Sequence, residues 1–489
     1  MSDGFAISLR KQRSVQSPSP IASGDYSASR LAAKARLAVT ASRSDAFDGA
    51  YHAHKSNANP ERDPFHGTQT MAKLGIDLSD RAVWEGSLFY RESWNAIDGP
   101  GIRNGVLIPV DVKDAFFTEE SWLAQNKLKA LIGDNWVSSL QLGYSHHRNR
   151  SSTLGIDLGY TADLYLARWQ NDQRLWQGDG SDALILFWGA EGRHENAYAP
   201  TFMPVAPGVI KRSATFTEER SQQAGFVETR FDYGKISGDA GVRYENYSRF
   251  GAQALIQANA AWRFIPQWML HAKGGNGFRI PSYAEKLFPL LGNPNLLPER
   301  GAGGDLGLEW RPVSQIKLDL TGFYNRYDNL ILISWNPIPF VKIPCLGECA
   351  SNLPNASVAG LEAGGEITLN DHWRGGMSYT YTDSRNLDTG RAVPFRARDS
   401  LRAWGEWRIP ALPLTLWAEG VYRGHSYNDV DNLLPVNDAF RLNLHANYKV
   451  ADKLDLYLRG ENLTNNKTPD FYGLDFAGAA VYGGIVLKL

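Results

Sequence analysis

The sequence lacks several features that define common protein classes. It has two cysteines in 489 residues, and no apolar run approaches the roughly 18 residues that a transmembrane helix needs. Basic and acidic residues are balanced at 51 and 52, so no excess of positive charge predicts nucleic-acid binding. These absences exclude a helical membrane protein. They leave a membrane β-barrel open, because its strands place lipid-facing residues only at every second position.

Catalytic and cofactor motifs are also missing. The sequence has neither G-x-S-x-G nor H-E-x-x-H, and the glycine-rich stretch at 274–278 does not open a phosphate-binding helix. The histidines that could form metal sites lack further ligands at matching spacing. They are His52 with His54, His146 with His147, and His194 with Glu191 and Glu195. We therefore expect no enzyme, no cofactor and no metal site.

Alternation of apolar and polar residues is the dominant pattern of the chain. In QIKLDLTGFYN, residues 315–325, the leucines fall on one face of an extended strand, and Lys317 and Asp319 fall on the other. KLDLYLRGENL repeats the pattern at 453–463. Tyr, Trp and Phe gather near the ends of such segments, as in WVSSLQLGY. The pattern predicts strands with one apolar face, one charged face and aromatic ends.

Segment lengths favour a membrane barrel over a soluble sandwich, whose strands also alternate. The alternating segments run to about 10–13 residues, whereas globular strands average about 5–6 and a tilted membrane crossing needs about 9–11. Short connections such as 133–135 alternate with long ones such as 194–219 and 279–302, as in outer-membrane barrels. We predict an all-β fold, a 22-stranded antiparallel transmembrane β-barrel of the outer-membrane type, with its first strands at 3–11, 29–42 and 46–56.

Two stretches resemble TonB-dependent outer-membrane receptors. GFRIPSYAEKLFPLLGNPNLLPER, residues 277–300, is similar to that family's mid-barrel signature, an aromatic-basic-x-Pro segment followed by G-N-P-x-L-x-P-E. LYLRGENLTNNKTPDFYGLDFAGAAVYGGIVLKL is similar to the family's C-terminal end, and the overall layout resembles its cobalamin-receptor branch. The matching positions are Phe278, Arg279, Pro281, Gly292, Asn293, Pro294, Leu296, Pro298, Glu299, Glu461, Asn462 and Leu463.

The resemblance implies a location, partners and a function. It implies a monomeric barrel embedded in outer-membrane lipid of a Gram-negative bacterium, with a small-molecule ligand such as a ferric siderophore or cobalamin. Uptake would be driven by the TonB energy complex acting through a plug domain. Residues 1–489 correspond to the barrel domain, and we expect no signal peptide, TonB box or plug domain in this sequence. A passive pore without a plug and a non-functional truncated receptor remain alternatives.

The long connections contain two further groups of candidates. Cys345 and Cys349, in KIPCLGECASNLP, would lie on the outer side, where an oxidising environment favours a disulfide that closes a small loop. The aromatic candidates for ligand contact are Trp94, Trp335, Phe340, Tyr427 and Tyr472. For these five residues, anchoring at the membrane interface is the alternative role.

The mid-barrel stretch contains too many prolines for a strand. Ser282 and Glu285 have the spacing of a capping box, which predicts one or two helical turns in YAEKLF. Pro294 and Pro298 favour extended geometry in the residues before them. The apolar side chains expected to pack onto the barrel wall are Leu287, Phe288, Leu290, Leu296 and Leu297. We therefore predict a rigid folded corner here, rather than a catalytic loop.

Overall fold

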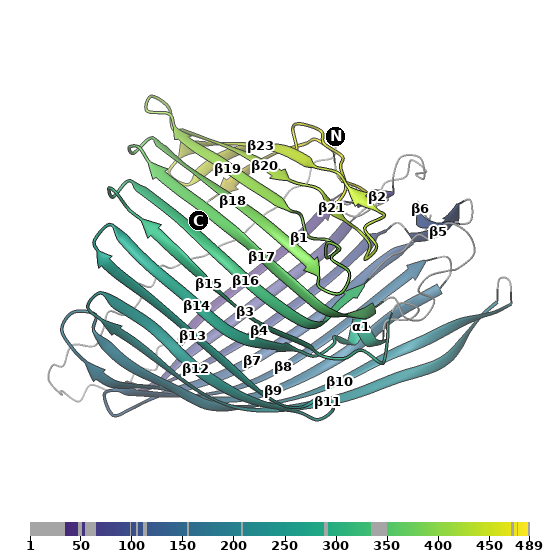
Figure 1. Cartoon of the computed structure of the whole chain (residues 1–489), viewed down its shortest axis with the longest axis horizontal. Coiled ribbons are helices and arrows are strands. Elements are labelled where there is room, and N and C mark those ends of the chain that lie inside the picture. Colours follow the sequence, from purple (N-terminus) through teal and green to yellow (C-terminus); the bar gives the residue numbers. More distant parts are fainter. Residues whose placement is uncertain are drawn as a thin grey trace.

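A single antiparallel sheet of 20 strands dominates the computed structural model. The structure describes residues 35–46, 51–53, 65–97, 99–103, 106–110, 115–153, 156–206, 209–287, 292–333, 350–470, 474–476 and 478–487. Figure 1 shows that the sheet curls round, so that β3, β4 and β7 lie behind β14, β15 and β16. Each strand pairs antiparallel with the next, from β1 with β3 to β24 with β26.

The strands of this sheet, in chain order, are β1 (Ala35–Ala46), β3 (Phe65–Ser79), β4 (Ala82–Ala96), β7 (Phe116–Ile132), β8 (Trp136–Thr153), β9 (Ile156–Gln177), β10 (Ala183–Ala206), β11 (Val209–Tyr233), β12 (Ile236–Tyr247), β13 (Gly251–Ile265), β14 (Trp268–Arg279), β15 (Glu299–Trp310), β16 (Ile316–Ile333), β17 (Ala350–Thr368), β18 (Trp373–Asn386), β19 (Asp399–Arg408), β20 (Leu414–Arg423), β23 (Ala439–Ala451), β24 (Leu454–Glu461) and β26 (Ala480–Leu487).

Short elements lie outside the main sheet. Three pairs of short strands are β2 (Tyr51–Ala53) with β25 (Leu474–Phe476), β5 (Gly99–Arg103) with β6 (Val106–Val110), and β21 (Ser426–Tyr427) with β22 (Pro435–Val436). The helix α1 (Tyr283–Leu287) has five residues. Nowhere in the described ranges is a helix long and apolar enough to cross a membrane.

The two faces of the main sheet differ in chemistry. Leu306, Leu320 and Leu361 share one face by register, and they are 57%, 54% and 52% exposed. Asp319 and Glu362 lie on the opposite face. We call the first the apolar face and the second the charged face. So large an exposed apolar surface marks contact with another apolar phase, as on the lipid side of a barrel, and the predicted two-faced strands are confirmed.

Tryptophan pairs mark one end of the apolar face. The rings of Trp268 and Trp310 stack with centroids 5.2 Å apart, and those of Trp373 and Trp407 stack at 4.9 Å. Register places all four on the apolar face beside the short turns. Aromatic rings in this position form the interfacial girdle of outer-membrane barrels. The aromatic strand ends predicted from the sequence are therefore present at the short-turn end.

The hairpin of β10 and β11 contradicts one predicted loop. These strands have 24 and 25 residues, so β11 extends roughly 80 Å at about 3.3 Å per residue. In Figure 1 the hairpin projects beyond the other strands on the right. The long loop predicted over 194–219 is wrong, because strand pairing continues past Pro200 and Pro204 with register shifts beside them. Such shifts let a strand accommodate proline, which lacks the N–H of a regular ladder.

The first strands also differ from the prediction. The prediction places a strand at 46–56 beside β3. In the structure the strand paired with β3 is β1, at 35–46, which overlaps the strand expected at 29–42. Of the described residues within 46–56, Tyr51–Ala53 form β2, which pairs with β25 outside the main sheet. The range 3–11 lies outside the described residues, so the count of 22 is not confirmed.

Buried glutamates hold basic side chains on the charged face. The side chain of Glu191 is 3% exposed, and its carboxylate lies 2.9 Å from Arg193, 3.0 Å from Arg243 and 3.9 Å from Arg168. The three arginine side chains are 24–41% exposed. Glu309 repeats the arrangement with Arg263, Arg311 and Lys317. The acids are thus covered, and the bases reach the open side of the sheet.

Candidate functional site

The corner, which we define as residues 280–298, connects β14 to β15. The backbone N–H of Glu285 donates to Ser282 Oγ at 3.2 Å, and the N–H of Ser282 donates to Glu285 Oε2 at 2.7 Å. These reciprocal hydrogen bonds form a capping box, which satisfies backbone donors at the start of α1. The predicted capping box and helical turn are confirmed, and α1 is the first element after the rim.

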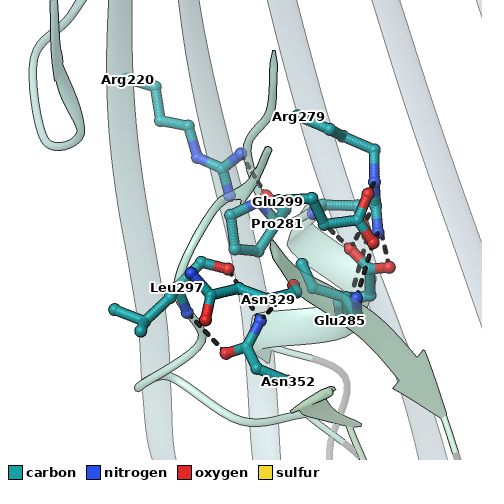
Figure 2. Close-up of polar contacts among 10 residues, drawn as sticks. Arg220, Arg279, Pro281, Glu285, Leu297, Glu299, Asn329 and Asn352 are labelled. Carbon is teal, nitrogen blue, oxygen red and sulfur yellow. Dashed lines mark hydrogen bonds and ion pairs between the residues drawn. The ribbon is translucent and has the colours of Figure 1, made fainter. Parts of the chain in front are cut away.

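Arg279 joins the two ends of the corner. Its Nε and Nη2 donate to Glu299 at 2.6 and 2.8 Å, and its Nη1 donates to both oxygens of Glu285 at 3.0 and 2.9 Å (Figure 2). The backbone N–H of Ile331 donates to Glu299 Oε1 at 2.6 Å. The guanidinium is 44% exposed, and the carboxylates are 14% and 13% exposed. One cation therefore bridges two carboxylates that are largely withdrawn from water and offsets one of their two negative charges.

Removing this cation should loosen the corner. In Arg279→Gln the two carboxylates face each other without a cation between them. We expect the free energy of local unfolding to fall by about 1–2 kcal/mol. The effect is smaller than for a fully buried pair because Arg279 is partly exposed. Hydrogen exchange over 283–299, followed by mass spectrometry, should speed up. Arg385→Gln is the matched control, since Arg385 and Asp383 are 59% and 39% exposed. Equal exchange in both variants would contradict the assignment.

Glu285 gives the corner a dependence on pH. Burial raises the pKa of its carboxyl, but hydrogen bonds from Arg279 and the Ser282 N–H outweigh burial and hold the pKa below its ordinary value of 4.5. A lowered pKa adds stability above the unfolded-state pKa, and this is lost as the pH falls through the folded-state pKa. We expect exchange of α1, corrected for its intrinsic rate, to accelerate only below about pH 4.5. If the acceleration of exchange at low pH persisted in Glu285→Gln, Glu285 would not be its source.

Asn352 fastens the return of the corner to the sheet. Its Oδ1 accepts from the Leu297 N–H at 2.8 Å, and its Nδ2 donates to the carbonyls of Leu297 and Asn329 at 3.0 and 2.8 Å (Figure 2). Asn329 has a φ of 56°, in the left-handed region that asparagine tolerates better than most residues. Because Asn352 holds the backbone of Leu297, the side chain of Leu297 stays 55% exposed. The prediction that Leu297 packs onto the wall is wrong.

Leu296 makes the apolar contact that the sequence predicts. It is 4% exposed and packs with Ile331 and Ala350. Beside it, Asn293 Nδ2 donates to the Ala350 carbonyl at 3.0 Å. Gly292, Pro294 and Pro298 lie in the same return, and Pro298 directly precedes β15. The packing of Leu296 is confirmed, whereas the side chains of Leu287, Phe288 and Leu290 lie outside what the structure describes.

Arg220 on β11 ties the corner to the charged face. Its Nη1 donates to the Pro281 carbonyl at 2.7 Å (Figure 2). Its Cζ lies 3.8 Å from the centroid of the Tyr283 ring. Its Nε donates to Glu218 Oε1 at 3.3 Å, and Lys286 Nζ donates to the same oxygen at 3.1 Å. Glu218 is 0% exposed, Arg220 5% and Lys286 9%. A buried ionic cluster thus fixes α1 on the sheet.

A cavity of about 390 Å³ lies beneath the corner. Residues 280–284 line one side, and strands β8 to β12 supply the other. The polar and aromatic lining from the strands is His147, Tyr160, Arg193, Glu195, Arg220, Gln222 and Tyr247. Phe278, at the end of β14, lies next to Tyr247 with ring centroids 5.7 Å apart. The cavity therefore combines hydrogen-bond donors with aromatic rings at the long-loop end of the sheet.

The C-terminal motif forms a second corner. Asn462 is 4% exposed and has a φ of 46°. Its backbone N–H donates to Asn443 Oδ1 at 2.9 Å, and its side chain bonds the N–H and carbonyl of Asn466 at 3.1 and 2.9 Å. The N–H of Leu463 donates to the Leu442 carbonyl at 2.8 Å. Glu461 pairs with Arg459 at 3.2 Å. These contacts turn the chain after β24, and they lie apart from the cavity.

The two aromatic candidates in the described residues, Trp94 and Tyr427, have their ring contacts away from the corner. Trp94 lies on the apolar face, where its ring is 6.2 Å from that of Phe116 and 5.8 Å from that of His66. Tyr427 lies in β21, with its ring 6.2 Å from that of His425. Trp335, Phe340, Tyr472, Cys345 and Cys349 lie outside the described residues, so their ligand-contact and disulfide roles stay predictions.

The histidine candidates have polar partners of their own. His146 Nδ1 lies 2.9 Å from Asp163 Oδ1, His147 Nδ1 lies 3.0 Å from Ser121 Oγ, and His194 Nδ1 lies 3.1 Å from Ser221 Oγ. In the described part of the chain, no group of three or more His, Cys, Asp or Glu side chains could hold a metal ion. The side chains of His52 and His54 lie outside that part.

Known proteins match this chain over most of its length. The family described as TonB dependent receptor-like, beta-barrel matches residues 16–463. The vitamin B12 transporter BtuB of Photobacterium profundum is 24% identical over 365 residues, which is 68% of this chain and 58% of that protein. The BtuB of Vibrio vulnificus is 24% identical over 249 residues, covering 50% and 38%. The chain thus spans little more than half, or less, of the length of these relatives.

Solved structures with the same fold include siderophore receptors. The siderophore receptor PirA from Acinetobacter baumannii aligns with a TM-score of 0.73 at 13% identity, covering 93% of this chain and 75% of that one. The ferric enterobactin receptor PfeA from Pseudomonas aeruginosa, in complex with BCV-L6, aligns at 0.69 and 17%, covering 93% and 76%. The ferric-catecholate import receptor Fiu from E. coli K12 aligns at 0.69 and 12%, covering 93% and 79%. At these identities the likeness shows the fold.

Proposed function

Because the chain belongs to the TonB-dependent receptor-like β-barrel family, we propose that it forms the barrel of a receptor that captures a scarce nutrient for TonB-dependent uptake. The family resides in the outer membrane of Gram-negative bacteria and consists of transporters rather than enzymes. The observation that carries the proposal is the family match over residues 16–463. The exposed apolar face of the sheet is what insertion into that membrane requires.

In this proposal the sheet closes into a 22-stranded barrel. The apolar face contacts lipid, and the charged face lines the lumen. The 20 strands of the described sheet support closure, since twisted open sheets rarely exceed about 10 strands without curling. A barrel of this width leaves an open lumen rather than a core filled by side chains. The corner and its cavity then lie at the outer end of the lumen, where a ligand first arrives.

We propose a ferric siderophore or a corrinoid as the ligand. The curated relatives are named as vitamin B12 transporters, and the solved structures as siderophore receptors. Both ligand classes are large and rich in oxygen or nitrogen acceptors, which suits a cavity whose lining has guanidinium, phenol, imidazole and amide groups beside one carboxylate, that of Glu195. The TonB complex would supply the energy for passage after binding.

Direct binding tests this function. The full chain, purified in detergent, should be titrated with a panel of ferric chelates and corrinoids, with the metal-free chelators as controls. We expect saturable binding of one class and weak or no binding of the other. Growth of a receptor-deficient strain on the bound nutrient would test uptake separately. If neither class bound to the folded chain, the receptor proposal would fail.

A further inference from the structure

A trough on the charged face follows β23, apart from the corner. Its floor is formed by Asn443, His445 and Asn447, which take successive charged-face positions of that strand. By register, Trp417 on β20 lies beside His445, and Tyr457 on β24 lies beside Asn447. The two flanking strands are roughly 10 Å apart, because each lies about 4.8 Å from β23. These five residues, which we call the trough, belong to a cavity of about 870 Å³.

The ring of Tyr457 forms a flat wall of this cavity. It lies over Gly484 on β26, where a Cβ atom would be 2.5 Å from the Tyr457 hydroxyl oxygen and 2.6 Å from two of its ring carbons. Only glycine permits so close an approach between a ring and the backbone. Backbone thus covers one face of the ring. Because Tyr457 also lines the cavity, its other face is the one that a ligand meets.

The charged groups of the lining are already paired. The pairs are Glu406 with Arg374 and Arg408, Glu419 with Arg402, and Glu461 with Arg459. Every carboxylate in the lining therefore has an arginine partner, and both arginines of the lining belong to these pairs. The other polar groups of the lining are hydroxyl, amide and imidazole groups. An ion entering the cavity would have to compete with a pair that is already formed, so the lining favours a neutral ligand.

We propose that the trough binds a neutral saccharide of a few sugar rings. The C–H face of a sugar ring stacks on the apolar face of an aromatic ring, which Trp417 and Tyr457 supply on the two sides. Each sugar hydroxyl both donates and accepts a hydrogen bond, and so do the Asn447 amide and the His445 imidazole between them. A volume of about 870 Å³ is near the upper end for ligand sites, which gives room for more than one ring. The assignment goes beyond the proposed receptor function and does not depend on it.

Maltotriose and cellotriose are suitable probes, titrated calorimetrically into the full chain in a detergent that has no sugar headgroup. We expect saturable binding of at least one of them, with one site per chain. Trp417→Leu should weaken this binding about tenfold, as for the loss of one aromatic stack. Trp404→Leu is the matched control. Trp404 lies on the same face of the neighbouring strand β19, opposite Glu419, but it is not among the described residues that line the cavity. Its replacement should leave the affinity unchanged.

A second variant keeps the test decisive if Trp417→Leu does not refold. Asn447→Ala removes an amide from the floor and should weaken binding about threefold or more, as for the loss of a neutral hydrogen bond. Trigalacturonate serves as the charged comparison, and it should bind more weakly than the neutral trisaccharides.

Three results would overturn the assignment. They are the absence of saturable binding of both neutral trisaccharides to the folded chain, an affinity unchanged by the trough variants, and tighter binding of trigalacturonate. The outcome is separate from that of the receptor proposal. A chain that binds a trisaccharide through Trp417 but binds no chelate or corrinoid supports the trough and contradicts the receptor function. A chain that binds a chelate or corrinoid but neither trisaccharide contradicts the trough alone.

Discussion

Replacing Gly360 by valine should prevent assembly of the sheet. A Cβ atom at this position of β17 would lie 2.0 Å from the Tyr381 carbonyl oxygen and 2.6 Å from Phe323 Cζ. The carbonyl belongs to the paired backbone of β18, where Gly360 faces Thr382. Backbone in a ladder cannot retreat by an ångström or more without breaking pairs on both sides. We expect the free energy of unfolding to fall by more than about 3 kcal/mol, as in severe overpacking.

The measurement is heat modifiability, in which a folded barrel migrates differently from the boiled chain on a gel. Gly360→Val should leave little or no folded species after refolding into detergent. Gly405→Val is the control, because a Cβ at Gly405 meets no atom within 4 Å. It makes the same chemical change in the same sheet and should refold normally. Normal refolding of both variants would show that Gly360 is not constrained as described.

Placing a charge on the apolar face should have the second largest effect. Leu320 is 54% exposed there, between Leu308 on β15 and Ala363 on β17. If this face contacts lipid, Leu320→Arg transfers a guanidinium into hydrocarbon. The expected cost is about 2–4 kcal/mol near the middle of the bilayer. In water the same substitution at an exposed position would cost almost nothing, so the size of the effect reports the surrounding phase.

Urea unfolding of the chain in lipid vesicles would measure this cost. Gln257→Arg serves as the control, since Gln257 lies on the charged face and borders open space. We expect its unfolding midpoint to stay close to that of the unaltered chain, and that of Leu320→Arg to fall clearly. Equal midpoints for the two variants would mean that the apolar face does not contact lipid.

Much of the sheet could be predicted because its signal is local. In β16 the period of two residues alone sorts leucines from charges, and lipid on one side keeps that sorting strict. The alternating segments predicted at 315–325 and 453–463 are both present in the main sheet, as β16 and β24. The prediction failed for the neighbour of β3, which is β1 (Ala35–Ala46) rather than a strand at 46–56. An alternating period alone does not say which of two nearby segments pairs with the next strand.

The candidate site could be predicted only in part, for a related reason. Ser282 and Glu285 are three residues apart, so their capping box is visible in the sequence. Arg220 reaches Pro281 across 61 residues, and Asn352 reaches Leu297 across 55. Each of these residues lies in a strand where nothing distinguishes it from neighbouring polar residues. Only the register of the sheet and the fold of the corner bring them together.

Because glutamates of the charged face are covered, the overall composition of the chain does not describe the charge that a solute meets there. The chain as a whole has a formal charge of −1. A solute beside the sheet does not meet that average, because Glu191 and Glu309 lie beneath the basic groups that they hold. The electrostatic potential at the open surface is set by the nearest charges, and a wall of low dielectric constant focuses it. A nearly neutral polypeptide can in this way present basic groups at the surface of its charged face.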